Sequence, residues 1–146
     1  MLRRVLVGFD GSRDALEALR VGAALAADAG GELAVALVVS ASHGETDEDR
    51  EAAFRSDSEP LRAAAERALE TAVSPALERS VSVLVGDHPA TALSSYAERR
   101  GFDVLVVGRH GRERAGHAGL GRVARELADK ARCPLLLVGD GHLDGE

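Results

Sequence analysis

The sequence predicts an α/β protein with an open five-stranded parallel sheet and helices on both of its faces. Five short apolar runs alternate along the chain with segments that have helical periodicity or helix-capping residues. Most of these runs are continuously apolar, which is typical of strands buried on both faces. Strands that alternate with helices form parallel sheets through right-handed crossovers.

The first three elements lie between residues 5 and 39. Residues 5–9 predict a strand, and Ser12 is a suitable N-cap for the helix that follows. Gly30 and Gly31 provide the stop signal of this helix, and residues 33–39 form a second apolar run. The helix face expected to be apolar consists of Leu16, Leu19, Ala23 and Ala27.

Residues 40–57 are polar and acidic, so we expect an exposed loop with at most a short helical turn near residues 51–55. The acidic residues in this segment do not have the spacing of a calcium-binding loop. Pro60 suits the first turn of a helix that runs to about Val73. The apolar face of that helix would consist of Leu61, Ala64, Ala65, Ala68, Leu69 and Ala72.

The second half of the chain repeats the alternation. Residues 81–85 predict a third strand, which we place at the sheet edge because its serine weakens one face. A helix follows, capped by Asp87 or His88 and ended by Gly101. The remaining expected elements are a strand at 103–107, a helix at 121–131 and a strand at 134–138. We expect residues 1–140 to form one domain and residues 141–146 to form a flexible polar tail.

Composition disfavours several classes of partner. The 146-residue chain has a net charge of −6 and a pI of about 5.4, which disfavours nonspecific nucleic-acid binding. Aromatic residues make up 3% of the chain, so no stacking platform for bases is expected. Cys133 is the single cysteine, which excludes an internal disulfide. No segment has the length of a membrane span, and the N-terminus lacks a signal-peptide pattern, so we expect a cytoplasmic protein without a membrane partner.

The segment from Gly108 to Gly121 concentrates the features of a phosphate site. Glycines allow sharp turns and leave backbone amides open to an incoming group, and the helix start at Gly121 adds unpaired donors. Between Gly108 and Arg122, four arginines stand against one glutamate, a net charge of +3 in an acidic chain. A simpler interpretation is a solvated basic loop whose glycines only form turns.

The position of this segment in the fold favours a ligand. In an open parallel sheet, ligands bind where the strand order reverses, at the carboxyl ends of the strands. If the strand order is 3-2-1-4-5, that point lies between the first and fourth strands. It would bring residues 10–12 against the turn at residues 108–111, so we expect a phosphate-bearing ligand in this crevice.

At this point the chain resembles the universal stress protein family over nearly its whole length. The matching stretches are VLVGFDGS at residues 5–12, VGDHPATAL at 85–93 and RCPLLLVG at 132–139. The G-x2-G-x9-G spacing of Gly108, Gly111 and Gly121 is the most specific match. The resemblance implies a Rossmann-like, adenine nucleotide alpha hydrolase-like fold of strand order 3-2-1-4-5. It also implies frequent homodimers and, in one branch, adenine-nucleotide binding.

The resemblance also implies a set of site residues, with ATP or another adenine nucleotide (ADP or AMP) as the cofactor. In nucleotide-binding members the residue matching Asp10 lies at the nucleoside end, and the residue matching Val38 contacts adenine. The glycine turn and the helix start hold ribose and phosphates, with backbone contributions at His110 and Val123. The candidate binding residues are Gly8, Phe9, Asp10, Val38, Val107, Gly108, Arg109, His110, Gly111, Gly121, Arg122 and Val123.

Arg122 departs from the family pattern, which has serine or threonine directly after the last glycine. A guanidinium group carries donors and no acceptor, so it cannot hold a metal ion, and Mg²⁺ is doubtful here. Arg122 could still neutralise phosphate charge through paired hydrogen bonds. Position 124, where another hydroxyl is often found, is Ala124.

Enzymatic functions have less support. Ser12, His110 and Asp10 could form a nucleophile, a base and an orienting acid, but a G-x-S-x-G turn is absent and Ser12 is needed as a helix cap. The histidines form no recognisable metal set, and the sequence has no P-loop motif. We expect no catalytic and no metal-binding residues, with slow ATP hydrolysis as the most that the chain would perform.

Two functions remain open. The first is an adenine-nucleotide-binding stress protein that acts through its conformation or its choice of partner. The second is a homodimer of the same fold that does not bind nucleotide and has an interaction role. An unprotected apolar edge strand invites pairing with another chain. The expected dimer therefore pairs through the last strand, at Leu135, Leu136, Leu137 and Val138.

Overall fold

The five strands form one parallel sheet in the order β3-β2-β1-β4-β5, which confirms the predicted fold class. The computed structural model describes residues 2–40, 44–111 and 120–139, so the expected tail lies outside the described residues. The strands are β1 (Arg4–Gly8), β2 (Glu32–Val39), β3 (Glu78–Val85), β4 (Val104–Gly108) and β5 (Leu135–Val138). The helices are α1 (Arg13–Ala29), α2 (Asp47–Ala72), α3 (Pro89–Arg100) and α4 (Arg122–Lys130).

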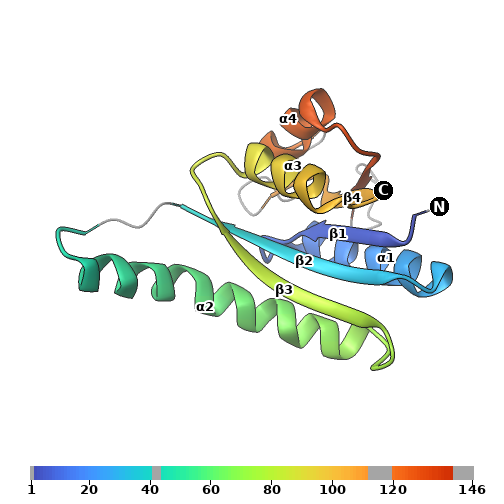
Figure 1. The fold of residues 1–146 in the computed structure, drawn as a ribbon, viewed down its shortest axis with the longest axis horizontal. Helices are drawn as coiled ribbons and strands as arrows, with labels where there is room; N and C mark the ends of the chain where they lie inside the picture. The colour runs from blue at the N-terminus through green and yellow to red at the C-terminus, as the bar shows by residue number, and fades with distance from the viewer. Residues whose placement is uncertain (1, 41–43, 112–119, 140–146) are drawn as a thin grey trace, which may run out of the picture.

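Helices cover both faces of the sheet, with α1 and α2 on one face and α3 and α4 on the other (Figure 1). Val5 and Val7 of β1 belong to the core shared with α1 and α2. Leu6 points to the opposite face and joins the core beneath α3 and α4. The strand is therefore buried on both sides, which explains its uninterrupted apolar run. No helix within the described ranges is long and apolar enough to cross a membrane.

The start of α2 shows that the expected loop at residues 40–57 is wrong. The helix begins at Asp47, and the Thr46 hydroxyl accepts a hydrogen bond from the Asp49 amide at 3.0 Å. Three acidic residues occupy the first turn, where negative charge is favourable against the positive end of the helix dipole. The acidic cluster is thus part of a helix start and not of a solvated connection.

Pro60 lies in the interior of α2 and not in its first turn, which corrects a second expectation. A proline inside a helix leaves the carbonyl four residues earlier, here that of Ser56, without its helical partner. Pro60 and Ser56 are both exposed, so water can satisfy that carbonyl. The exposed position explains why α2 continues through the proline.

The buried face of α1 is rotated from the expected one. Leu19 and Ala23 are buried as predicted, but Leu16 is 40% exposed and Ala27 is also exposed. Gly22 lies against β1, because a Cβ there would come within 2.5 Å of the Val7 side chain. This close approach turns the small-residue side of the helix towards the sheet. The buried set is Asp14, Ala15, Ala18, Leu19, Gly22, Ala23 and Ala26.

β3 lies at the sheet edge as predicted, but it is longer than expected. It begins at Glu78 and pairs with the whole of β2, from Glu32 to Val39. Ser82, the serine that marked the strand as an edge, lies with its hydroxyl 3.4 Å from that of Tyr96 on α3. The polar position on this strand is therefore satisfied by the helix that covers it.

Asp103 joins the amino ends of β1 and β4. Its carboxylate accepts hydrogen bonds from the Arg4 amide at 2.8 Å and from the Arg3 amide at 3.0 Å. These bonds, with that from Arg4 as the larger influence, hold the pKa of Asp103 below its ordinary value. The contact fixes the edge of the sheet opposite to the one where the predicted site lies.

Candidate functional site

The loops that follow β1 and β4 lie side by side at the carboxyl edge of the sheet. β1 pairs with β2 on one side and with β4 on the other, so the strand order reverses at this point. The Ser12 hydroxyl donates to the His110 carbonyl at 3.4 Å. Asp10 Oδ2 lies 3.2 Å from the point that a Cβ on Gly111 would occupy. The structure therefore brings the two loops together, as the sequence predicts.

The loop after β1 is fixed by its own short-range hydrogen bonds. Gly11 has a φ of +82°, a left-handed conformation that glycine adopts without strain. Asp10 Oδ1 accepts a hydrogen bond from the Ser12 amide at 2.9 Å, and the Ser12 hydroxyl accepts one from the Ala15 amide at 3.1 Å. The predicted capping role of Ser12 is confirmed, and Asp10 keeps one carboxylate oxygen free of these bonds.

Gly121 lies directly against the turn that follows β4. A Cβ on Gly121 would lie 3.2 Å from each of three backbone atoms, namely Arg109 O, Gly111 N and His110 Cα. The Gly121 amide also donates to the Arg109 carbonyl at 2.6 Å. We call this contact between residues 109–111 and Gly121 the glycine junction. It holds the start of α4 against the turn with no side chain between them.

The amino end of α4 presents backbone donors that have no partner within the helix, and they lie beside the glycine junction. Gly121 supplies no side-chain cap, and the first helical hydrogen bond runs from the Arg125 amide to the Gly121 carbonyl at 3.0 Å. The amides of residues 122–124 therefore have no partner within the helix. Together with the positive end of the helix dipole, they suit an anion. Arg122 is exposed and forms no ion pair with the described residues.

Asp14 and His110 form a largely buried pair that the sequence patterns did not predict. Asp14 Oδ2 lies 3.0 Å from the His110 amide nitrogen and 2.9 Å from His110 Nδ1. Asp14 is 6% exposed, and His110 Nε2 is buried without a hydrogen-bond partner among the described residues. The available signal was an acid in the first turn of a helix, but most acids at that position face solvent.

Three of the candidate residues belong to the face of the sheet beneath α3 and α4. A Cβ on Gly8 would lie 2.8 Å from the Leu93 side chain and 3.1 Å from that of Val107, so Gly8 has no free space beside it. Val107 is buried, and Val38 is half-buried at the carboxyl end of β2. The Val38 side chain is thus the more accessible of the two valines.

Phe9, Arg109 and Val123 are differently placed. Phe9 is 3% exposed in the core on the α1 and α2 side, and its amide donates to the Ala36 carbonyl at 3.0 Å. Neither its ring nor its amide is free for a ligand. The Arg109 amide donates to the Val138 carbonyl, while Val123 lies in the first turn of α4 and is half-buried against the core on that face of the sheet. The remaining charged residues of the basic loop, Arg112, Glu113 and Arg114, lie outside the described residues.

The described residues do not assemble the nucleophile of a hydrolase. The Ser12 hydroxyl is engaged with the Ala15 amide and the His110 carbonyl. The His110 ring is paired with Asp14 and not with Asp10. Within the described ranges, no three His, Cys, Asp or Glu residues are grouped so that they could hold a metal ion.

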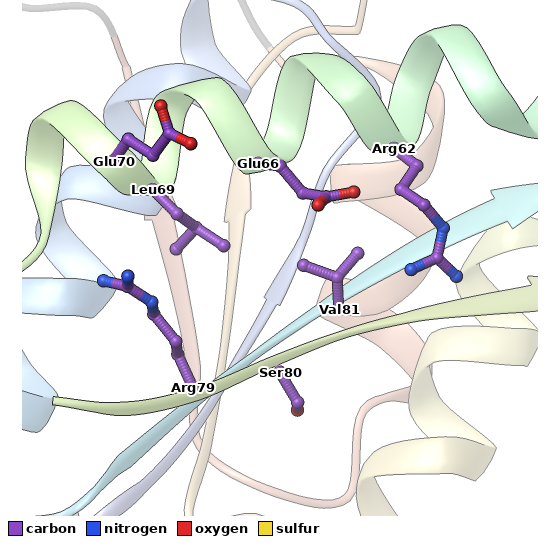
Figure 2. A pocket seen from close by; sticks show the side chains of 7 residues that line it. All are labelled: Arg62, Glu66, Leu69, Glu70, Arg79, Ser80 and Val81. Atoms are coloured by element: carbon purple, nitrogen blue, oxygen red, sulfur yellow. The ribbon is translucent and has the colours of Figure 1, made fainter. Parts of the chain in front are cut away.

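A cleft of about 290 Å³ lies elsewhere, between α2 and the edge strand β3 (Figure 2). Figure 2 shows Glu66 projecting from the helix towards the strand, and Arg79 projecting from the strand towards the helix. The lining residues are Arg62, Glu66, Leu69, Glu70, Arg79, Ser80 and Val81. The cleft has no glycine turn and no helix start, so it lacks the features of the predicted site.

An open parallel α/β sheet of this strand order, with a glycine turn where the order reverses, is a Rossmann-like domain. The model of the universal stress protein family matches residues 1–139. The chain therefore belongs to the universal stress protein family.

Solved structures share this fold. A universal stress protein in complex with cAMP is 22% identical, with a TM-score of 0.70 over 94% of this chain and 98% of that chain. A universal stress protein from Archaeoglobus fulgidus in complex with dAMP is 22% identical, with a TM-score of 0.59 over 94% and 99%. A protein from Mycobacterium tuberculosis H37Rv is 29% identical, with a TM-score of 0.53 over 92% of each chain.

Proposed function

We propose that this protein binds an adenine nucleotide (ATP, ADP or AMP) in the crevice between the loops after β1 and β4. In the stress response it would act through the conformation or the choice of partner that the bound nucleotide favours. The observation that carries the proposal is the glycine junction, where a Cβ on Gly121 would crowd the backbone of residues 109–111 at 3.2 Å. This arrangement places the open amides at the start of α4 next to the turn, as a phosphate requires.

The structural neighbours support the class of ligand. One of them was solved with cAMP and another with dAMP, so adenine nucleotides bind to proteins of this fold. In this chain the phosphates would lie at the glycine junction and the start of α4. The nucleoside would lie towards Asp10, Val38 and Val107.

Arg122 would supply positive charge to the phosphates. Its side chain is exposed and free of ion pairs with the described residues, so it can turn towards an anion without breaking an ion pair to any of them. A guanidinium group fits phosphate through paired hydrogen bonds, but it cannot hold a metal ion. The Asp14 carboxylate is engaged by His110 through Oδ2, and the Asp10 carboxylate by the Ser12 amide through Oδ1, so both carboxylates beside the turn already serve to fix the loops. The proposal therefore does not depend on Mg²⁺.

Nucleotide should raise the melting temperature of the purified, nucleotide-stripped protein. A ligand that binds only the folded state adds about 2.7 kcal/mol of stability at a hundredfold excess over Kd. We expect ATP to raise the Tm measured by differential scanning fluorimetry, and Arg122→Ala to reduce that shift. The matched control is Arg132→Ala, because Arg132 is an exposed arginine beyond α4 that pairs with Glu98 at 3.7 Å. An unchanged Tm at saturating ATP would favour the alternative, a family member with an interaction role and no nucleotide.

We also propose that the protein forms a homodimer through the open edge of β5. Leu136 is 36% exposed on this edge strand, whereas Leu135 and Leu137 pack into the core beneath α3 and α4. Exposed apolar edges favour pairing with a second chain. We expect Leu136→Arg to sediment as a monomer in analytical ultracentrifugation. Leu2→Arg, at a similarly exposed leucine outside the strands, should keep the mass of the wild type. A wild-type monomer at tens of micromolar would contradict the dimer.

A further inference from the structure

Asp14 lies in the first turn of α1, and it is unusual for that position because its carboxylate is buried. It is 6% exposed in the first turn of α1, and a buried carboxylate is costly unless it is hydrogen-bonded. The structure provides two donors to the same oxygen. Asp14 Oδ2 accepts from the His110 amide at 3.0 Å and faces His110 Nδ1 at 2.9 Å. The acid on α1 is therefore satisfied by one residue of the turn after β4.

This contact exists because Gly108 lets the two segments approach. A Cβ on Gly108 would lie 2.7 Å from the Asp14 Cβ, so the end of β4 packs directly on the first turn of α1. The Ser12 hydroxyl adds a bond to the His110 carbonyl at 3.4 Å. The first turn of α1 thus holds the amide, the carbonyl and the ring of His110.

The pairing also decides where the ring of His110 carries its proton. An ionised carboxylate only accepts hydrogen bonds, so Nδ1 must be the donor to Asp14. Nε2 is buried without a partner among the described residues, and a rotation of the ring to satisfy it would break the bond to Asp14. The ring is therefore held in one orientation and, when neutral, in the Nδ1–H tautomer.

His110 is also the central residue of the turn in the glycine junction. Its Cα, together with Arg109 O and Gly111 N, would lie 3.2 Å from a Cβ on Gly121. A residue that fixes His110 thereby fixes the turn against which the start of α4 is held. This chain of contacts runs from α1 through His110 to the amides that would face a phosphate.

We infer that Asp14 is a positioning residue for the nucleotide site. It clamps His110 through two hydrogen bonds and so keeps the turn at residues 108–111 in the geometry that binds phosphate, without itself touching the ligand. This inference rests on the proposed function, because it assigns a role within the same site. When binding groups are already fixed in place, the entropic cost of ordering them on ligand binding is lower.

The test uses Asp14→Ala, Asp14→Asn and His110→Ala in the full chain, with ATP as the probe in calorimetric titrations. We expect Asp14→Ala to weaken ATP binding by about tenfold or more, since small displacements of positioning groups have large effects. Asp14→Asn keeps an oxygen that can accept both bonds, so it should bind within about threefold of the wild type. The double variant Asp14→Ala/His110→Ala should lose little more ATP affinity than Asp14→Ala alone, because the two residues act as a unit.

A second measurement reports on the clamp without any ligand. Two-bond ¹H–¹⁵N spectra of histidine rings, recorded where the rings are neutral, should show His110 as the Nδ1–H tautomer in the wild type. The Nε2–H form should appear in Asp14→Ala, whose fold is checked by its circular dichroism and Tm. A folded Asp14→Ala protein that binds ATP like the wild type would overturn the positioning role. A wild type that binds no ATP would overturn the proposed function, and the tautomer would still decide whether the clamp exists.

Discussion

Replacing Gly121 with valine is expected to abolish most nucleotide binding. The new side chain would meet backbone atoms of Arg109, His110 and Gly111, each 3.2 Å from its Cβ. Backbone has little freedom to yield, so the start of α4 must move away from the turn. We expect the Kd for ATP to rise by about a hundredfold, which corresponds to about 2.7 kcal/mol. Calorimetric titration of the folded variant measures this directly.

The matched control for this change is Gly86→Val. Gly86 lies after the edge strand β3, and the nearest atom to a Cβ there is the Ala92 Cβ at 3.9 Å, an ordinary contact. The control adds the same side chain to a glycine with open space, so ATP affinity should remain that of the wild type. ATP binding by Gly121→Val at wild-type strength would contradict the glycine junction as the phosphate site.

Leu19→Ala is expected to cause the second large effect, a loss of about 2–5 kcal/mol in the free energy of unfolding. Leu19 is 0% exposed, and it packs in the core between α1 and the sheet. The same substitution at Leu16, three residues earlier on α1, should cost less than about 1 kcal/mol because that side chain is 40% exposed. Urea denaturation monitored by circular dichroism gives both values.

The leucine pair also tests the orientation of α1 on the sheet. Helical periodicity alone places Leu16 and Leu19 on one apolar face, and it therefore predicts similar losses for the two variants. The structure predicts unequal losses, because Gly22 lets the helix approach β1 on its small-residue side. Equal destabilisation by the two substitutions would show that the helix is rotated from its position in this structure.

The sheet could be predicted from the sequence because its strands are short apolar runs with clear ends. Val5 to Val7 and Val104 to Val107 are buried on both faces, and such runs have few alternative structures. The serine in β3 correctly marked an edge strand, because an edge tolerates a polar position. The order of the strands, by contrast, came from the family resemblance.

Helix α2 could not be placed correctly because two local signals were misleading. The acidic cluster near Asp47 resembles a solvated loop, yet its charges suit the first turn of a helix capped by Thr46. Pro60 resembles a helix start, yet an exposed helix interior can also accommodate it. In both cases the residue type is compatible with a helix. Whether it marks the start, the interior or the outside of that helix depends on tertiary packing, which the local sequence does not show.

The glycines of the candidate site were visible in the sequence, whereas Asp14 was not. Glycine spacing and the adjoining helix start are local features, so Gly108, Gly111 and Gly121 could be named in advance. The partner of Asp14 lies 96 residues away in the sequence, and only the packing of α1 on β4 brings His110 to it. Burial of a charged side chain by such a long-range contact cannot be predicted from local periodicity.

Calorimetric titration of the nucleotide-stripped wild-type protein with ATP, with and without Mg²⁺, tests the central claim most directly. We predict saturable binding with one nucleotide per chain and an affinity that is retained when Mg²⁺ is left out, because Arg122 replaces the hydroxyl that would help to hold the metal ion. No measurable heat at millimolar ATP, in a protein whose melting curve shows that it is folded, would contradict the account. The crevice between β1 and β4 would then be a feature of the fold that this chain does not use for nucleotide.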